Sequence, residues 1–152
     1  MEKEDKRTEK RKLGDLGEKI ACRFLVKRGF EIVEQNYSKK WGEIDIIARR
    51  CVGQAQKNEK LHFIEVKTVS HLPFITVRKD GKAYETDNYR PEDNLHPWKL
   101  KRLSRAIQTY LLGYRGNRDV THETDWQFDV IAVYLDLKGL QAKVDYQADI
   151  II

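Results

Sequence analysis

The fold of this chain depends on two short apolar stretches, Gly42-Glu43-Ile44-Asp45 and Phe63-Ile64-Glu65-Val66-Lys67. Runs rich in Ile, Phe and Val are typical of β-strands. Alternate residues of a strand face the same side, so Glu65 and Lys67 should point one way and their neighbours the other. The segment from Arg49 to Lys60 carries Gly, Gln, Asn and charges, which predicts a loop. An antiparallel hairpin would then set Asp45 beside Glu65.

Two carboxylates at that distance repel each other, and one pKa should rise unless a cation lies between them. Oxygen ligands suit Mg²⁺ or Mn²⁺ better than zinc. A nearby lysine can position or deprotonate a water, or stabilise the charge that develops on a phosphate. Glu-x-Lys on a strand is more often a solvated ion pair. The metal interpretation gains weight because Asp45 and Glu65 both interrupt apolar runs, where a merely solvated charge is less expected.

Length and composition set the class of protein. With 152 residues, 40% hydrophobic and 35% charged, the chain is long enough for one domain with a sizeable core and a polar surface. The net charge of +5 permits a polyanionic partner without requiring one. Cys22 and Cys51 show no paired spacing, which fits reduced thiols in a cytoplasmic protein. We expect neither a signal peptide nor a membrane span, because no long apolar segment is present.

The first 27 residues predict a helix and a charged segment before it. Residues 1–12 are almost all charged and predict either a frayed tail or the charged start of that helix. Residues 13–27 have helical periodicity. Glu18 is either a surface acid, the common case, or an acid directed over the sheet toward the acid pair. The expected buried stripe is Leu13, Leu16, Ile20 and Phe24.

The segments before and after the acid pair predict a strand with a turn and a long excursion. Phe30–Glu34 predicts a first strand, followed by a turn through Lys39, Lys40 and Trp41. Aromatic rings among lysines could stack a base or sugar, or pack over the edge of the core. Residues 68–96 form a long excursion with a small hairpin around Asp80-Gly81. Such a segment is either a binding element or an insertion without a role.

A second helix should begin at Pro97, followed by two more strands. Its basic face carries Lys99, Lys101, Arg102 and Arg105 and is either a phosphate-binding surface or a solvated helix face. Residues 126–135 predict a central strand, and residues 140–146 a last one. Asp129, inside that apolar run, either completes the polar site or pairs with a base such as Arg102. The four histidines lack ligand spacing, so zinc is not expected. The expected buried stripe of the second helix is Leu100, Leu103, Ile107, Tyr110 and Leu111.

This order of elements resembles the PD-(D/E)XK nuclease superfamily. In the residues of its sequence motifs, the chain is similar to the YraN family, which is related in fold to archaeal Holliday junction resolvases. The likeness rests on four segments and continues through residues 99–112 and 128–133. The resemblance implies an α/β fold, with a mixed central β-sheet flanked by helices around a restriction-endonuclease-like core. Residues 13–152 would form this single domain, with an insertion at 68–96. The four segments are residues 13–18, 29–37, 42–48 and 63–68.

The resemblance also implies roles for individual residues. Asp45, Glu65 and the backbone carbonyl of Val66 would hold Mg²⁺ or Mn²⁺, Glu18 would assist, and Lys67 would act at the attacking water. The chain departs from the pattern where Ile44 replaces a common proline and Leu100 a frequent glutamine.

We therefore expect a metal-dependent endonuclease acting on DNA, with branched or damaged DNA as candidate substrates. A homodimer is expected if two symmetric cuts are made. A non-catalytic nucleic-acid-binding protein that keeps the nuclease fold is the alternative, and a protein-interaction module built on the excursion is a third. The expected nucleic-acid contacts are Lys39, Lys40, Trp41, Lys99, Lys101, Arg102 and Arg105.

Overall fold

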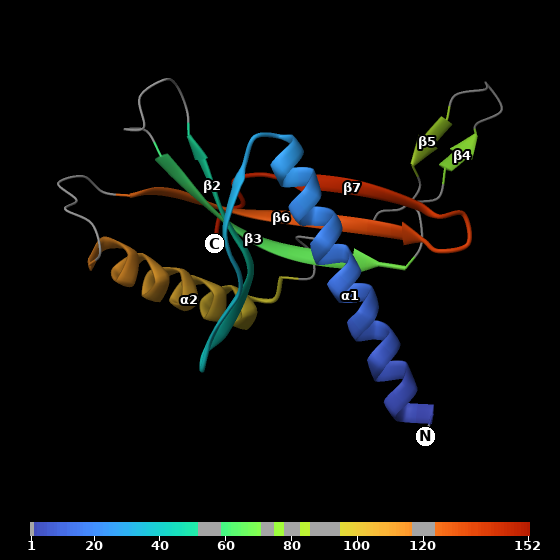
Figure 1. Cartoon of the computed structure of the whole chain (residues 1–152), viewed down its shortest axis with the longest axis horizontal. Helices are drawn as coiled ribbons and strands as arrows, with labels where there is room; N and C mark the ends of the chain where they lie inside the picture. Colours follow the sequence, from blue (N-terminus) through green and yellow to red (C-terminus); the bar gives the residue numbers. More distant parts are fainter. Residues whose placement is uncertain (1, 52–58, 71–74, 78–82, 86–94, 117–123) are drawn as a thin grey trace.

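A five-stranded mixed sheet forms the centre of the protein (Figure 1). The computed structural model describes residues 2–51, 59–70, 75–77, 83–85, 95–116 and 124–152. The strand order is β1-β2-β3-β6-β7; β3 runs parallel to β6, and the other neighbours are antiparallel. The expected mixed α/β architecture is thereby confirmed. The strands are β1 (Glu31–Lys39), β2 (Gly42–Cys51), β3 (Glu59–Val69), β6 (Asp125–Asp136) and β7 (Gln141–Gln147).

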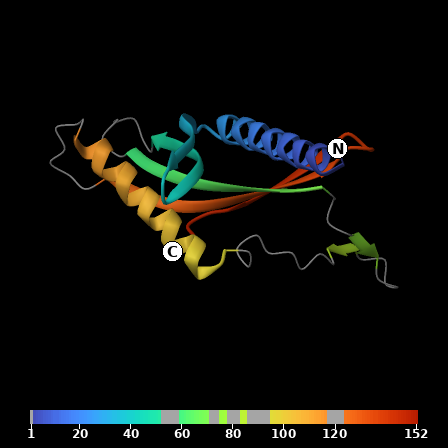
Figure 2. The same ribbon diagram turned by 90° about the horizontal axis from the view of Figure 1, so that it is seen from below.

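One helix covers each face of the sheet (Figure 2). Helix α1 (Glu2–Lys27) packs on the face that carries Ile46, Ile64 and Ile131. Helix α2 (Pro97–Gly116) packs on the opposite face. Neither helix is long and apolar enough to cross a membrane, nor is any other in the described part of the chain. The buried side chains of the α2 face include Ile44, Ile47, Phe63, Leu103, Ile107 and Phe128.

The excursion after β3 contains a second, two-stranded sheet. Strands β4 (Ile75–Val77) and β5 (Ala83–Glu85) pair in antiparallel fashion, as the predicted hairpin requires. Its expected turn at Asp80-Gly81 lies outside the described residues. Helix α2 begins at Pro97, as predicted.

The strands next to the acid pair are longer than predicted. β1 continues past Glu34 to Lys39, and only Lys40 and Trp41 form the turn. The predicted loop from Arg49 to Lys60 was too long, because β2 runs through Cys51 and β3 starts at Glu59. Charges at these strand ends pair across the sheet: the guanidinium of Arg49 binds Glu31 at 2.6 Å and Glu59 at 3.1 Å. The charged residues at these strand ends therefore form ion pairs between strands and do not indicate a loop.

Helix α1 packs its predicted stripe against the sheet except at Leu16: Leu13, Ile20 and Phe24 are partly buried against the core. It begins at Glu2, so the charged segment is the start of the helix. Gly17, Ala21 and Leu25 are buried, whereas Leu16 is 39% exposed. A Cβ on Gly17 would overlap Thr68 Oγ1, so the helix backbone lies close to β3 at this point. Small residues set the buried face because they permit this approach.

Candidate active site

The site lies at the point where β2 separates from β3, which we call the fork. The β2–β3 ladder runs from Cys51 opposite Glu59 to Ile46 opposite Ile64, and its next step would set Asp45 opposite Glu65. Beyond that point β2 stays paired with β1 as far as Gly42. The backbone N–H of Val66 donates to Asp45 Oδ2 at 2.8 Å, which fixes this carboxyl at the fork.

Asp45 and Glu65 form a pair of partly desolvated acids. Glu65 is 7% exposed and Asp45 is half-buried. Burial, followed by the Glu65 carboxylate, raises the pKa of Asp45 to about 8, although the Val66 N–H opposes the rise. The two carboxyls therefore share a site in which a proton or a cation must offset one negative charge. The sequence predicted this pairing from the hairpin alone.

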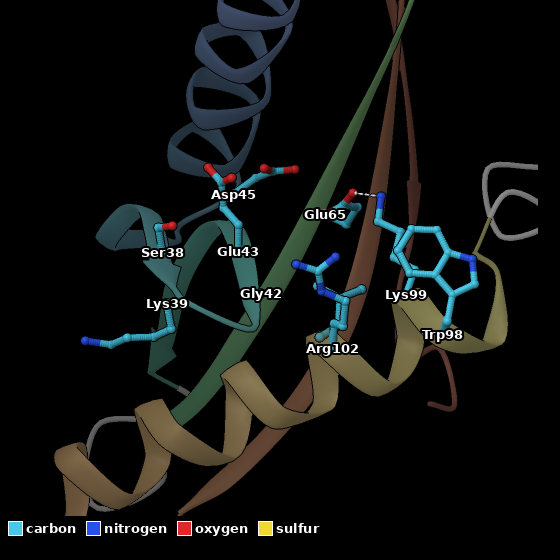
Figure 3. A pocket seen from close by; sticks show the side chains of 10 residues that line it. Ser38, Lys39, Gly42, Glu43, Asp45, Glu65, Trp98, Lys99 and Arg102 are labelled. Carbon is cyan, nitrogen blue, oxygen red and sulfur yellow. Dashed lines mark hydrogen bonds and ion pairs between the residues drawn. The ribbon is translucent and has the colours of Figure 1, made fainter.

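Two lysines reach the same oxygen of Glu65. Lys67 Nζ lies 3.7 Å from Glu65 Oε1, and Lys99 Nζ lies 2.5 Å from it (Figure 3). Burial, and then the neighbouring Lys99, lowers the pKa of Lys67. Burial alone would lower the pKa of Lys99 too, but the bond to Glu65 reverses the effect and the pKa is raised. Lys99 therefore holds its charge on the acid, while Lys67 is the lysine more easily deprotonated.

Glu18 approaches the acid pair from α1. It follows Gly17, where the helix backbone lies close to Thr68 of β3. Burial raises the pKa of Glu18, and the charges of Asp15, Glu43 and Glu65 add to the rise. Of the two predicted alternatives, an acid directed toward the sheet describes its position better than a surface acid. Three acids and a lysine thus converge from α1, β2 and β3.

The acid pair separates two hollows, each of which contains both Asp45 and Glu65 in its wall. The α2 hollow, of about 410 Å³, is lined by Ser38, Lys39, Gly42, Glu43, Asp45, Glu65, Trp98, Lys99, Arg102 and Leu103. The α1 hollow, of about 450 Å³, is lined by Lys10, Leu13, Gly14, Glu18, Asp45, Glu65, Val66, Thr68 and Ser70. A ligand can therefore reach the two carboxyls from either face of the sheet.

The predicted nucleic-acid contacts divide into three groups. Lys39, Lys99 and Arg102 line the α2 hollow, while Lys40 and Lys101 are exposed outside it. Trp41 and Arg105 instead attach the β1–β2 turn to α2.

The attachment of Trp41 is specific. The Arg105 guanidinium lies 4.7 Å from the centre of the indole, and Arg102 Nε donates to the Trp41 carbonyl at 2.8 Å. The indole Nε1 is buried without a hydrogen-bond partner among the described residues. A Cβ on Gly42 would lie 2.7 Å from the Arg102 carbonyl oxygen, so the turn sits directly on the helix. In this position Trp41 packs against α2, and its stacking on a base or sugar stays a prediction.

Asp129 pairs with a basic side chain, the second of its two predicted roles, but the partner is His62 and not Arg102. Asp129 is fully buried and does not join the acid pair. Burial alone would raise its pKa, but hydrogen bonds, led by that from His62, lower it below the ordinary value. Its oxygens are bound by His62 Nδ1, Tyr146 Oη, Gln127 Nε2 and the Asp149 backbone N–H at 2.6 to 2.8 Å.

Sequence reasoning missed Trp98. This residue lines the α2 hollow, although 60% of it is exposed. A signal was present, because Trp98 directly precedes the basic residues of α2 and falls outside that helix's apolar stripe. The buried residues of α2 are Leu103, Ala106, Ile107 and Leu111, with Leu100 and Tyr110 partly buried, as predicted for all but Ala106.

The donor atoms at the fork suit a hard divalent cation. No group of three or more His, Cys, Asp or Glu side chains in the described ranges is arranged to hold a metal ion. The available protein donors are the carboxylates of Asp45 and Glu65, with the carbonyl of Val66 as the predicted third. Mg²⁺ and Mn²⁺ are commonly held by one or two carboxylates plus water or substrate oxygens. The raised pKa of Asp45 means that, without a metal, a proton occupies this carboxyl near neutral pH, and a bound cation would displace it.

The protein is therefore of the mixed α/β class. It carries a site of acids and a lysine where the pairing of β2 and β3 ends. The chain belongs to the uncharacterised protein family UPF0102, which it matches over residues 17–133. This finding confirms the YraN-like family expected from the sequence. The matched segment includes Glu18, Asp45, Glu65 and Lys67.

Relatives in several bacteria cover most of the chain. A UPF0102 protein of Campylobacter lari is 32% identical over 133 residues, which is 88% of this chain and 93% of the relative. One from Campylobacter fetus is 36% identical, over 79% of this chain and 81% of the relative. One from Pelobacter propionicus is 35% identical, over 88% and 78% respectively. These names give the family and no activity, so function must be argued from the site.

Proposed function

We propose that this protein is a metal-dependent endonuclease that hydrolyses phosphodiester bonds of DNA. The observation that carries the proposal is the meeting of Asp45, Glu65 and Lys67 at the fork, with Glu18 on the same hollow. The order of elements, which resembles the PD-(D/E)XK superfamily, supports it. The basic residues of α2 give the site a way to hold a polyanion.

The residues at the fork would have different roles in hydrolysis. Asp45, Glu65 and the Val66 carbonyl would hold Mg²⁺ or Mn²⁺, which when bound neutralises charge on the phosphate and lowers the pKa of water. The Val66 N–H keeps the Asp45 carboxyl in place. Lys67, with its lowered pKa, accepts a proton from the attacking water at Nζ. Arg102, directed into the α2 hollow in Figure 3, contacts the phosphates.

A second candidate function is DNA binding without cleavage. Lys99 Nζ lies 2.5 Å from Glu65 Oε1 and offsets its charge without any metal. A protein with that ion pair and a basic helix can bind a strand and leave it intact. Against this alternative, clustered acids repel phosphate, and a protein that only binds DNA has no use for them.

Cleavage assays separate the two functions. Labelled single-stranded, duplex, flapped and four-way-junction DNA would be incubated with Mg²⁺, Mn²⁺ or EDTA. The proteins would be the unaltered chain, Glu65→Ala, Lys67→Ala and, as a matched control, Lys138→Ala, which removes an exposed lysine of the β6–β7 turn outside both hollows. We expect metal-dependent cutting that falls by about 10²-fold or more in the two site variants and stays unchanged in the control. Intact binding with no cutting under any condition would favour the second function.

A further inference from the structure

The side chain of Trp98 is exposed in the wall of the α2 hollow. It is 60% exposed, although α2 buries other apolar side chains against the sheet. The His96 ring lies nearly parallel to it, at 6° and a centroid separation of 6.5 Å. The Arg102 guanidinium lies 6.0 Å from the centre of the indole. Trp98 thus presents a flat aromatic surface beside a cation, the arrangement on which nucleobases stack.

This surface lies close to the acid pair. Trp98 and Lys99 are consecutive, so their Cα atoms are about 3.8 Å apart. Lys99 reaches Glu65 Oε1, and Trp98 borders the same hollow as Asp45 and Glu65 (Figure 3). A nucleotide whose phosphate lies at the acid pair can therefore place a neighbouring base on the indole. The hollow, at about 410 Å³, is within the usual range for small-molecule sites, ~300–1,000 Å³.

Stacking on Trp98 requires an unpaired base. In a duplex both faces of each base are covered by neighbouring bases, so a side chain can reach a face only where the strand is single or splayed. The cations around the indole, Lys99 and Arg102, can hold phosphates on either side of such a base.

We propose that the α2 hollow binds an unpaired nucleobase stacked on Trp98, so that the substrate is a DNA strand with unpaired bases beside the phosphate to be cut. This inference rests on the proposed function and adds the substrate class to it. Flaps, gaps and open junctions contain such bases, whereas a continuous duplex does not.

The test measures binding in EDTA, where no metal-dependent cutting occurs. The probes are a labelled strand of about 15 nucleotides, copies with one abasic site at successive positions, and a duplex of equal length. The proteins are the full chain and its variants Trp98→Ala and Trp98→Phe. Leu112→Ala is the matched control, because Leu112 is a 70% exposed apolar residue of α2 outside the hollow. Since Trp98 is exposed, its replacement leaves the core intact.

We expect Trp98→Ala to bind the single strand roughly 5- to 100-fold more weakly and the duplex as before. Trp98→Phe should retain most of the affinity, and Leu112→Ala all of it. An abasic site at one position should weaken binding by the full chain but cost little extra in Trp98→Ala, because base and indole act as one pair. Equal losses on strand and duplex, or abasic penalties of the same size in both proteins, would overturn the stacking site and leave a protein-docking role for Trp98.

Failure of this inference is distinguishable from failure of the proposed function. A protein that shows the Trp98-dependent strand binding but cuts no DNA would refute the endonuclease and retain the stacking site. A protein that cuts duplex and single strands equally well, with or without Trp98, would refute the stacking site alone. Absence of binding to every probe would refute the stacking site, while the endonuclease would be decided by the cleavage assay with metal.

Discussion

At the scale of single residues, the ionisation of Asp45 is opposed by its surroundings. Its pKa of about 8 exceeds the ordinary 3.8, so the folded protein keeps this proton at pH values where the unfolded chain has lost it. The free energy of unfolding should therefore fall as pH rises from about 4 to about 8 in the absence of metal. Asp45→Asn removes this penalty and keeps an acceptor for the Val66 N–H.

We expect Asp45→Asn to be more stable than the unaltered protein by about 1–3 kcal/mol near pH 8 in EDTA, with a smaller gain near pH 5. Urea denaturation across this range measures the difference. Ser38→Ala, which alters a residue of the same hollow that carries no titrating group, is the control and should show no such trend. A gain that grows toward acid pH would contradict the assignment.

Lys99 competes with any cation for Glu65. Its ammonium lies 2.5 Å from Glu65 Oε1, an oxygen that a metal would need. Lys99→Met should therefore bind Mn²⁺ more tightly, by roughly 10-fold, and should be less stable without metal because the two acids lose their counter-ion. Calorimetric titration with Mn²⁺ tests this, with Lys101→Met as the control of equal charge. Weaker Mn²⁺ binding would show that Lys99 supports the metal site instead of competing for it.

At the scale of elements, the contact between α1 and β3 depends on Gly17. A Cβ there overlaps Thr68, whereas one on Gly14 meets nothing within 4 Å. Gly17→Ala should cost about 1–3 kcal/mol of stability, because the helix must move off the strand. Gly14→Ala should gain about 0.5–1 kcal/mol, because alanine favours the helix. Thermal unfolding compares the two substitutions, which are identical in chemistry.

The same contact links stability to activity. Displacing α1 also displaces Glu18, so cleavage by Gly17→Ala should fall at temperatures where the protein is fully folded. Normal cleavage by the folded Gly17→Ala protein would mean that Glu18 plays no part in the reaction.

The sequence predicted which helices and strands are present better than it predicted their end residues and their buried side chains. Alternation and periodicity located the strands around Asp45 and Glu65 and the helix from Pro97, because these signals come from burial of one face. The face of α1 was predicted wrongly only at Leu16, since hydrophobicity favoured this residue while close backbone approach buried its neighbour Gly17. Strand ends were missed where charges such as Arg49 pair across the sheet.

The sequence predicted the geometry of the candidate site best within the hairpin, and gave Glu18 only as one of two alternatives. Register brings Asp45 and Glu65 together across two neighbouring strands. The positions of Lys99 and Trp98 depend on how α2 is rotated on the sheet, which local pattern does not specify. Contacts of this kind, between residues 34 positions apart, follow from packing of the whole domain.

At the scale of the whole molecule, the Asp129 network joins three neighbouring strands of the sheet, β3, β6 and β7. Asp129 of β6 binds His62 of β3, Tyr146 of β7 and the backbone of Asp149. Its pKa is lowered, so its contribution to stability is present above the ordinary value of 3.8 and is lost as pH falls below it. Acid should therefore unfold the protein partly through this residue, in the opposite direction to the effect of Asp45.

Asp129→Asn places an amide N–H₂ among donors and should cost about 3 kcal/mol or more at neutral pH. Tyr146→Phe removes a single bond and should cost about 1–2 kcal/mol. Asp136→Asn, which keeps an acceptor for the Gly139 N–H in an exposed turn, is the control and should change little. Chemical denaturation measures all three. If the network only supports the fold, the folded fraction of Asp129→Asn should cut DNA at the normal rate. Lost cleavage with full stability would instead place Asp129 in the reaction.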